Sequence, residues 1–152
     1  DSKKLTPTIR TELSTLIKTK AKNWAVGLVD AKELDKVGLT TATELAMKQA
    51  IDALTCLPDY LLLDYVPIDS WEQPYQLIKQ GDSSSYSIAA ASIIAKVHRD
   101  QIMTKIDSEY PEYDFASNKG YGTKVHMEAL SKYGPCDIHR RSFSPVQRAE
   151  NK

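Results

Sequence analysis

Apolar positions along the chain recur at helical spacing in several long segments, each bounded by capping or helix-breaking residues. The first segment follows Thr6-Pro7, where threonine is a favourable N-cap and proline suits the first helical position. A later segment is apolar almost all the way round between Ile88 and Ala95, which indicates a buried helix. The pattern predicts helices at 7–22, from 30 to a break at Gly38, from 40 or 41 to 54, from after 82 to about 110, where Pro111 follows, and at 123–133, closed by Gly134.

Short apolar runs between these helices predict strands. Trp24–Val29 is rich in aromatic and β-branched residues. Leu61-Leu62-Leu63 shows no alternation, which predicts a strand buried on both faces, as in a helix-covered sheet. A third strand is predicted at 75–79, ending at Gly81-Asp82, whereas 112–122 and the arginine-rich tail, 136–152, are predicted to be irregular. Strands that alternate with helices indicate an α/β fold, in which sites gather at the strand ends.

The composition is that of an ordinary globular domain. The chain has 152 residues, 41% apolar and 26% charged, enough for a core of its own. Lys and Arg number 20, as do Asp and Glu, so a nucleic-acid partner requires a local basic face. The two cysteines, Cys56 and Cys136, are far apart and indicate free thiols in a reducing compartment. No apolar run is long enough to span a membrane.

Two carboxylates, Asp64 and Asp82, stand at predicted strand ends. If the two strands are neighbours, the carboxylates converge, and such a pair is stable when a hard divalent cation such as Mg²⁺ or Mn²⁺ binds between them. The functional interpretation is a metal site for phosphodiester chemistry. The alternative is structural: Asp82 caps the following helix and Asp64 is a solvated loop residue. Spacing alone favours this alternative modestly.

The run Gly120-Tyr121-Gly122-Thr123 is the most unusual local pattern. A tyrosine between two glycines is held on a tight backbone, and its ring can stack on a nucleotide base or sugar. The alternative is a tyrosine that closes a small satellite core beneath a loop. The two interpretations have equal support from the sequence.

Two basic patches lie at either end of the chain. One is Asp1-Ser2-Lys3-Lys4, and the other combines His139-Arg140-Arg141 with three further residues, Lys119, Lys124 and Arg148. Either patch alone is most simply solvated surface, but two patches and a tyrosine-bearing loop favour contact with a phosphate backbone. His98 and His126 have no metal-like spacing and are expected to be ordinary surface or half-buried residues.

Seven runs, in this order and spacing, resemble ribonuclease HII. They cover nearly the whole chain, and the alanine- and isoleucine-rich run and the Gly-Tyr-Gly-Thr run are specific. The runs are Asp1–Leu5, Pro58–Asp64, Lys79–Asp82, Ile88–Asp100, Tyr110-Pro111, Lys119–Thr123 and Ile138–Phe143.

The resemblance implies a ribonuclease H-like α/β fold, a mixed sheet flanked by helices, with a C-terminal helical and loop extension. It implies an endonuclease that hydrolyses RNA in RNA–DNA hybrids and incises 5′ of ribonucleotides embedded in duplex DNA, leaving 5′-phosphate and 3′-hydroxyl ends. The family uses four carboxylates with Mn²⁺ or Mg²⁺, and two of these match Asp64 and Asp82. Tyr121 matches the tyrosine that stacks on the sugar at the junction. Nucleic-acid contacts are also expected from Gly120, Gly122, Ser2, Lys3, Lys4, Lys119, Arg140 and Arg141.

One part of the family pattern has no match in this sequence. The resemblance implies a first strand, upstream of the Asp1–Lys4 run, with an Asp-Glu pair and a Gly-Arg-Gly run that recognises the ribose 2′-hydroxyl. We therefore expect residues 1–152 to form a single ribonuclease H-like domain that is incomplete at its N-terminus. Because that strand is central in the sheet, we expect this polypeptide alone to be unstable or to aggregate, and to be poorly active.

Two rival functions are consistent with the same residues. One is a hybrid nuclease like ribonuclease HIII, which is expected to cut a single embedded ribonucleotide poorly. The other is a non-catalytic nucleic-acid-binding remnant. In the favoured interpretation the protein is cytoplasmic, serves DNA replication and repair, does not bind membranes and is a monomer when complete.

Overall fold

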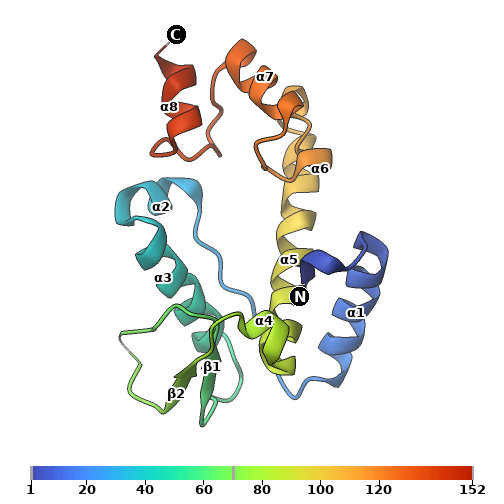
Figure 1. The fold of residues 1–152 in the computed structure, drawn as a ribbon, viewed down its shortest axis with the longest axis vertical. Coiled ribbons are helices and arrows are strands. Elements are labelled where there is room, and N and C mark those ends of the chain that lie inside the picture. The colour runs from blue at the N-terminus through green and yellow to red at the C-terminus, as the bar shows by residue number, and fades with distance from the viewer. Residues whose placement is uncertain (1, 70, 152) are drawn as a thin grey trace. The chain divides into compact units, whose positions relative to one another are not determined.

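The computed structural model describes residues 2–69 and 71–151. Asp1, part of the predicted N-terminal basic run, lies outside the described residues. The chain forms two compact units, which are taken separately below (Figure 1). Unit 1 comprises Asp1–Val29 and Thr40–Val97, and unit 2 comprises Asp30–Leu39 and His98–Lys152. The prediction of a single domain over residues 1–152 stays a prediction.

Unit 1 is built on two short parallel strands, β1 (Leu61–Leu63) and β2 (Tyr75–Leu77), with Leu61 opposite Tyr75. Helix α3 (Leu39–Asp52) contributes Ile51 to a core whose other buried members are Leu61, Leu63 and Ile68. The prediction that the leucine strand is buried on both faces is wrong, because Leu62 is 37% exposed. The apolar side chains of β1 that point toward α3 thus form the core of this unit.

The N-terminal elements of unit 1 are η1 (Ser2–Lys4) and α1 (Pro7–Lys20). The predicted helix start is confirmed: the Thr6 side chain accepts a hydrogen bond from the Ile9 amide. Arg10 of α1 is buried, although arginine side chains are mostly exposed, and it donates to the Ser2 carbonyl at 2.8 Å. The guanidinium thereby pairs with a backbone carbonyl of η1. The apolar pattern of α1 does not predict this contact.

The segment Trp24–Val29 forms neither a helix nor a strand, contrary to the predicted strand. Its backbone runs against α3 instead. A Cβ on Gly27 would lie 1.8 Å from the Ala46 carbonyl oxygen, and the Leu28 amide donates to the Gln49 side chain at 2.9 Å. The Leu28 amide thus bonds to a side chain of α3, where the predicted strand would have bonded to a neighbouring strand.

After β2 the chain turns through Gln80, in the left-handed conformation (φ 55°), into the short helix α4 (Gly81–Ser84) and then α5 (Tyr86–Asp107). The predicted strand is therefore shorter than expected, and Asp82 lies in the first turn of α4 rather than at a strand end. The prediction that α5 is buried all round is wrong. Ile88, Ile93, Ile94 and Val97 are buried, whereas Ala91 and Ala95 on the other side are exposed.

Unit 2 is helical in its described part and packs around aromatic side chains. Tyr113 and Phe115 are 2% and 1% exposed, and their rings stack with centroids 5.3 Å apart. Helices α6 and α8 occur where loops were predicted, because Asp114 and Pro145 start short helices that show little apolar periodicity. The elements are α2 (Ala31–Val37), η2 (Pro111–Tyr113), α6 (Phe115–Asn118), α7 (Lys124–Tyr133) and α8 (Ser144–Glu150).

Candidate active site and nucleic-acid interface

Asp64 directly follows β1, and its carboxylate is tied to the segment that follows β2. The Asp64 Oδ1 accepts a hydrogen bond from the Gly81 amide at 2.9 Å. Asp82 is the next residue. Because β1 and β2 are parallel neighbours, both segments leave the same edge of the sheet. The predicted condition for convergence, neighbouring strands, is therefore confirmed.

Asp82 is half-buried in the first turn of α4. Its Oδ1 lies 3.4 Å from the Ser83 hydroxyl, which donates to it. The residue that precedes α4 is Gln80, and the residue that precedes α5 is Ser85, whose hydroxyl oxygen lies 3.5 Å from the Ile88 amide. Asp82 thus does not occupy the N-cap position of α4, which is Gln80, and the choice between a metal ligand and a structural role stays a prediction.

The carboxylate oxygens of Asp64 and Asp82 are the type of ligand that a hard divalent cation prefers. Mg²⁺ is commonly held by one or two carboxylates together with water and substrate phosphate oxygens. Asp64 and Asp82 supply two carboxylates, and the amide bond from Gly81 fixes the orientation of the first. Among residues 2–69 and 71–151, no group of three or more His, Cys, Asp or Glu side chains is arranged to hold a metal.

The Lys119–Thr123 loop, in unit 2, is held by a dense set of backbone bonds. Lys119 and Gly120 adopt left-handed conformations, with φ of 52° and 77°. The Asn118 side chain accepts from the Gly120 amide at 2.7 Å and donates to the Tyr113 carbonyl at 2.6 Å. Arg99 donates to the Lys119 carbonyl at 2.6 Å. These hydrogen bonds therefore fix the backbone conformation of the loop.

The Tyr121 ring lies at the surface of unit 2 and is 55% exposed. The Arg99 guanidinium lies over it, 5.2 Å from the ring centroid, in a cation–π contact. The satellite core that the sequence offered as an alternative exists, but Tyr113 and Phe115 fill it. Tyr121 therefore presents an aromatic face at a position that a base or sugar can reach.

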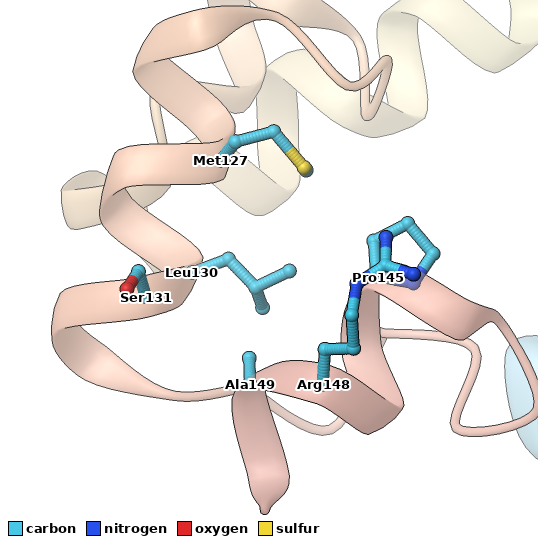
Figure 2. Close-up of a pocket in the computed structure, with 6 residues that line it drawn as sticks. All are labelled: Met127, Leu130, Ser131, Pro145, Arg148 and Ala149. Atoms are coloured by element: carbon cyan, nitrogen blue, oxygen red, sulfur yellow. The ribbon is translucent and has the colours of Figure 1, made fainter. Parts of the chain in front are cut away.

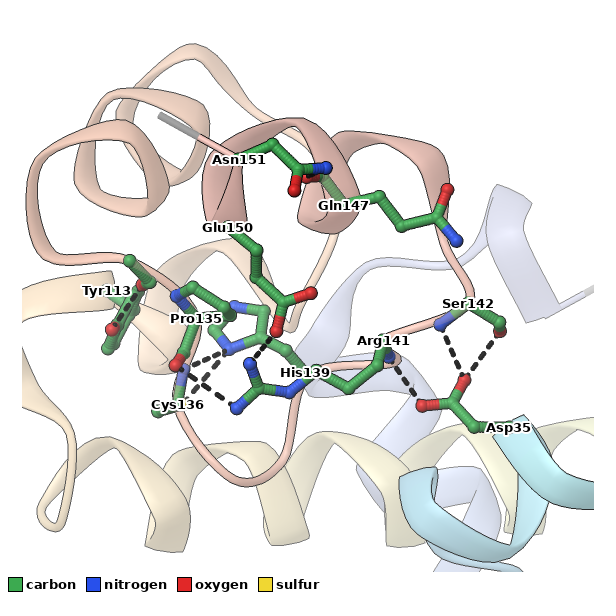
Figure 3. A network of polar contacts seen from close by, with 11 residues as sticks. Asp35, Tyr113, Pro135, Cys136, His139, Arg141, Ser142, Gln147, Glu150 and Asn151 are labelled. Atoms are coloured by element: carbon green, nitrogen blue, oxygen red, sulfur yellow. Dashed lines mark hydrogen bonds and ion pairs between the residues drawn. The ribbon is translucent and has the colours of Figure 1, made fainter.

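The predicted C-terminal basic cluster is engaged within unit 2 (Figure 3). Arg141 pairs with Glu150, and its amide and that of Ser142 donate to Asp35. Lys124 pairs with Glu128 at 3.8 Å. The Lys119 amine donates to the Thr104 hydroxyl at 2.7 Å and to the Ala116 carbonyl at 2.6 Å. Arg140 is exposed.

His139 was expected to contribute positive charge to that cluster, and this expectation is wrong. The side chain is 8% exposed, and burial, with the nearby His126, lowers its pKa from 6.5 to about 4. At neutral pH the imidazole is uncharged. The expectation for His126, a surface or half-buried residue, is also wrong, because His126 is 4% exposed.

Arg148 lies on a pocket between α7 and α8, lined also by Met127, Leu130, Ser131, Pro145 and Ala149 (Figure 2). The pocket has a volume of about 180 Å³ and faces solvent. Its lining contains one charged side chain and neither of the aspartates discussed above, so it is a packing gap between two helices rather than part of the carboxylate site.

The N-terminal patch of unit 1 divides into a buried and an exposed part. Ser2 is 5% exposed, and its hydroxyl oxygen accepts from the Ser92 hydroxyl at 2.9 Å. Lys3 and Lys4 are exposed on the same 3₁₀ turn. Ser2 and Arg10 thus hold the turn, and the two lysines carry its positive charge outward.

The sequence assigned no role in the loop around Tyr121 to four residues whose side chains organise it. They are Arg99, Asn118, His126 and His139. Arg99 bonds to a carbonyl 20 residues away, and the two histidines contact each other across 13 residues, so local spacing gives little sign of them. An asparagine immediately before Lys119-Gly120 was the one available signal, because Asn side chains often bond to the backbone of turns.

The fold is that of a known crystal structure. The crystal structure of ribonuclease H2 from Pyrococcus horikoshii superposes with a TM-score of 0.85, covering 99% of this chain and 79% of that chain at 24% identity. This likeness confirms the expected ribonuclease H-like α/β fold, of which the residues described here contribute two parallel strands and the helices around them.

Sequence comparison then gives the family. The ribonuclease HII family model matches residues 1–146. Proteins named ribonuclease HII are 47% identical in Dehalococcoides mccartyi and 51% identical in Clostridioides difficile, over 97% and 94% of this chain. The chain spans 69% and 56% of the length of these two relatives. It belongs to the ribonuclease HII family of type 2 ribonuclease H hydrolases. No helix in the described parts of the chain is both long and apolar enough to cross a membrane.

Proposed function

We propose that this chain carries part of the active site of an endoribonuclease that hydrolyses RNA in RNA–DNA hybrids and incises 5′ of ribonucleotides embedded in duplex DNA. The products carry a 5′-phosphate and a 3′-hydroxyl, and the reaction depends on Mn²⁺ or Mg²⁺. The observation that supports this most directly is the bond from the Gly81 amide to Asp64 Oδ1, which ties the segments after two parallel strands together beside Asp82. A cytoplasmic location and a monomeric state stay predictions.

In this mechanism Asp64 and Asp82 would hold the cation at the site where the scissile phosphate binds. When bound, the cation supplies Lewis-acid activation and charge neutralisation at that phosphate. Asp64 is oriented by the Gly81 amide, so one of its oxygens has a fixed direction. The half-burial of both carboxylates limits the water that screens their charge.

The remaining residues bind the nucleic acid and take no part in bond cleavage. Lys3 and Lys4 attract phosphates from an exposed turn, which Ser2 and Arg10 support from beneath. Tyr121, flanked by Gly120 and Gly122, stacks on the sugar at the junction. Lys119, Arg140 and Arg141 are proposed as further phosphate contacts; among them the Lys119 amine and the Arg141 guanidinium have partners within unit 2.

The central test replaces Asp82 by asparagine, which keeps the size of the side chain and removes its charge. Incision of a duplex with one embedded ribonucleotide is measured with Mn²⁺ and with Mg²⁺, under single-turnover conditions with protein in excess, so that slow cleavage is detected. We expect cleavage to fall by about 10²-fold or more, because a cation ligand is worth several kcal/mol in the transition state.

The matched control is Asp52→Asn, at the exposed end of α3 in the same unit. It should leave cleavage within about twofold, since isolated surface charges contribute little. Cleavage by Asp82→Asn at the rate of the original chain would refute the assignment. Cleavage of a hybrid without incision at a single embedded ribonucleotide would favour the ribonuclease HIII-like alternative.

A non-catalytic nucleic-acid-binding role is the second candidate. The observation that favours it is that residues 2–69 and 71–151 hold no group of three or more potential metal ligands. Salt-dependent binding of a hybrid without metal-dependent cleavage, unchanged by Asp82→Asn, would establish this role and replace the first proposal.

A further inference from the structure

Four residues of unit 2 form a continuous chain of polar contacts that ends at Tyr121. The His139 Nδ1 lies 3.0 Å from the Cys136 amide nitrogen and 3.1 Å from its sulfur. The His139 Nε2 lies 3.1 Å from the His126 Nε2, and the His126 Nδ1 lies 2.9 Å from the Tyr121 carbonyl oxygen. Figure 3 shows the Cys136 end of this chain.

The two ends of the chain determine where the imidazole protons are. A carbonyl oxygen only accepts, so the His126 Nδ1 carries hydrogen and donates to Tyr121. A backbone amide only donates, so the His139 Nδ1 carries no hydrogen and accepts from Cys136. The neutral ring of His139 therefore carries its hydrogen on Nε2, and the neutral ring of His126 leaves its Nε2 as an acceptor.

These assignments, made independently from opposite ends, agree in the middle. The His139 Nε2–H donates to the bare His126 Nε2, 3.1 Å away. A proton added to the His126 Nε2 would place two N–H groups face to face, and a proton added to the His139 Nδ1 would face the Cys136 amide hydrogen. The arrangement thus exists only with both rings neutral.

Packing fixes the planes of the two rings. His126 and His139 are 4% and 8% exposed. Phe115 lies with its ring centroid 5.3 Å from that of His126 and 5.6 Å from that of His139. The Tyr113 ring centroid is 5.0 Å from that of His139, and its hydroxyl donates to the Gly134 carbonyl. Neither imidazole can turn over without displacing an aromatic ring.

We propose that His126 and His139 are positioning residues for Tyr121, acting through a hydrogen-bond relay whose tautomers are fixed, and this rests on the proposed role of Tyr121 at the junction. The Tyr121 carbonyl accepts from His126 and also from the Thr123 amide at 2.8 Å. Two donors on one oxygen fix the peptide plane that follows Tyr121, and with it the direction in which the ring leaves the loop.

Burial, and then two neighbouring groups, favour the neutral form of His139. Arg141 and the other imidazole both oppose a positive charge on His139. The Cys136 thiol is half-buried and donates to the same nitrogen as the Cys136 amide, and burial raises its pKa. A backbone hydrogen bond at Cys136 favours the charged form of His139, but burial, His126 and Arg141 outweigh it. Two carboxylates, Glu112 and Asp137, act on the Cys136 thiol and help to raise its pKa.

The first test needs no substrate. Imidazole ¹⁵N resonances distinguish protonated from bare ring nitrogens, and the chain has three histidines, so His98→Gln completes the assignment. We expect the Nδ1–H tautomer for His126 and the Nε2–H tautomer for His139 at pH 7.5. The Nε2–H tautomer on both rings, which is the common form in water, would overturn the relay whatever the enzyme does.

The second test uses two variants of His126 that lose the ring but keep different atoms. Asparagine places its amide nitrogen near the position of Nδ1 and still donates to Tyr121, whereas glutamine places its amide near Nε2 and does not. We expect the Tyr121 carbonyl ¹³C shift to move in His126→Gln and to stay in His126→Asn. Equal movement in both variants would reduce His126 to a packing residue.

Preference for a duplex with one embedded ribonucleotide over an all-DNA duplex is then measured for both variants. We expect His126→Gln to lose about fivefold and His126→Asn to stay within about twofold, since the difference is one hydrogen bond. His98→Gln should change nothing. If the original chain shows no preference, the proposed function has failed. The relay is then judged by the Tyr121 carbonyl shift alone, and an unchanged shift in His126→Gln overturns it.

Discussion

Tyr121 is held in unit 2 through its backbone and through one face of its ring. Its carbonyl accepts from His126, its amide donates to Asn118, and Arg99 covers the ring at 5.2 Å. None of these interactions needs the ring to be buried. Removal of the ring should therefore change what the surface binds and leave the core of the unit intact.

We predict that Tyr121→Ala lowers preference for the ribonucleotide junction by about tenfold, because stacking of an aromatic ring on nucleic acid contributes roughly 1–3 kcal/mol. Tyr121→Phe retains the ring and should stay within about twofold. Binding to matched duplexes with and without the ribonucleotide measures the effect. A parallel loss of thermal stability in Tyr121→Ala alone would show that the ring is structural.

At the level of single residues, the sequence indicated the exposed and half-buried candidate site residues better than the buried polar residues. Asp64, Asp82 and Tyr121 were singled out because each interrupts a local pattern. His139 was assigned to a basic surface patch and Arg10 was given no structural role, since polar residues are mostly exposed. Their burial depends on backbone acceptors and rings contributed by distant parts of the chain, such as the Ser2 carbonyl for Arg10.

Helix α7 and the segment before α8 are joined by the contact between His126 and His139, which makes this part of unit 2 sensitive to pH. The pKa of His139 is about 4 in the folded state and about 6.5 in an exposed histidine, chiefly because burial disfavours its charge. A lowered histidine pKa means that the unfolded state binds the proton first as pH falls.

We therefore predict that unit 2 is fully stable above about pH 6.5 and loses stability as pH falls from about 6.5 to about 4. The loss is up to about 3 kcal/mol, from 1.36 kcal/mol per pKa unit. Urea unfolding followed by the aromatic ring resonances of unit 2 measures it. His139→Gln keeps a donor toward His126 but cannot titrate, so its stability should fall less over this range. Parallel curves for the two proteins would contradict the prediction.

Elements with a strong local start or stop were predicted well. Thr6, Asp30 and Thr123 cap helices as expected, and Gly38 and Gly134 end them with φ of 82° and 74°. Elements decided by distant partners were not. The segment Trp24–Val29 has the composition of a strand, but the backbone of α3 approaches it too closely for strand pairing. Helices α6 and α8 are too short to show a period.

For the molecule as a whole, zero net charge means that nucleic acid is attracted locally. We predict that Lys3→Gln and Lys4→Gln each lower the slope of log binding constant against log salt by about 1, because each removes one phosphate contact. Lys48→Gln, an exposed lysine of α3, should leave the slope unchanged. Equal slopes for all three variants would place the phosphate contacts elsewhere.

The fold class could be predicted because alternating strands and helices occur in few architectures. The carboxylate site could be predicted only in part. Parallel pairing of β1 and β2 follows from an α/β fold, but the bond from Gly81 to Asp64 depends on the left-handed turn at Gln80. A glutamine gives no sequence signal for such a turn.

Gln80 and Gly81 are neighbours with opposite constraints. Gln80 has φ 55°, a conformation that glycine or asparagine adopts more easily. Gly81 has no positive φ, but a Cβ there would lie 2.4 Å from Ile88 Cδ1 and 3.5 Å from Asp64 Oδ1. We therefore expect position 80 to tolerate residues that favour a positive φ. Position 81 should accept only glycine, because a larger side chain would collide with Ile88. A single substitution at position 80, to glycine or asparagine, should therefore stabilise the turn beside Asp82 without changing either carboxylate.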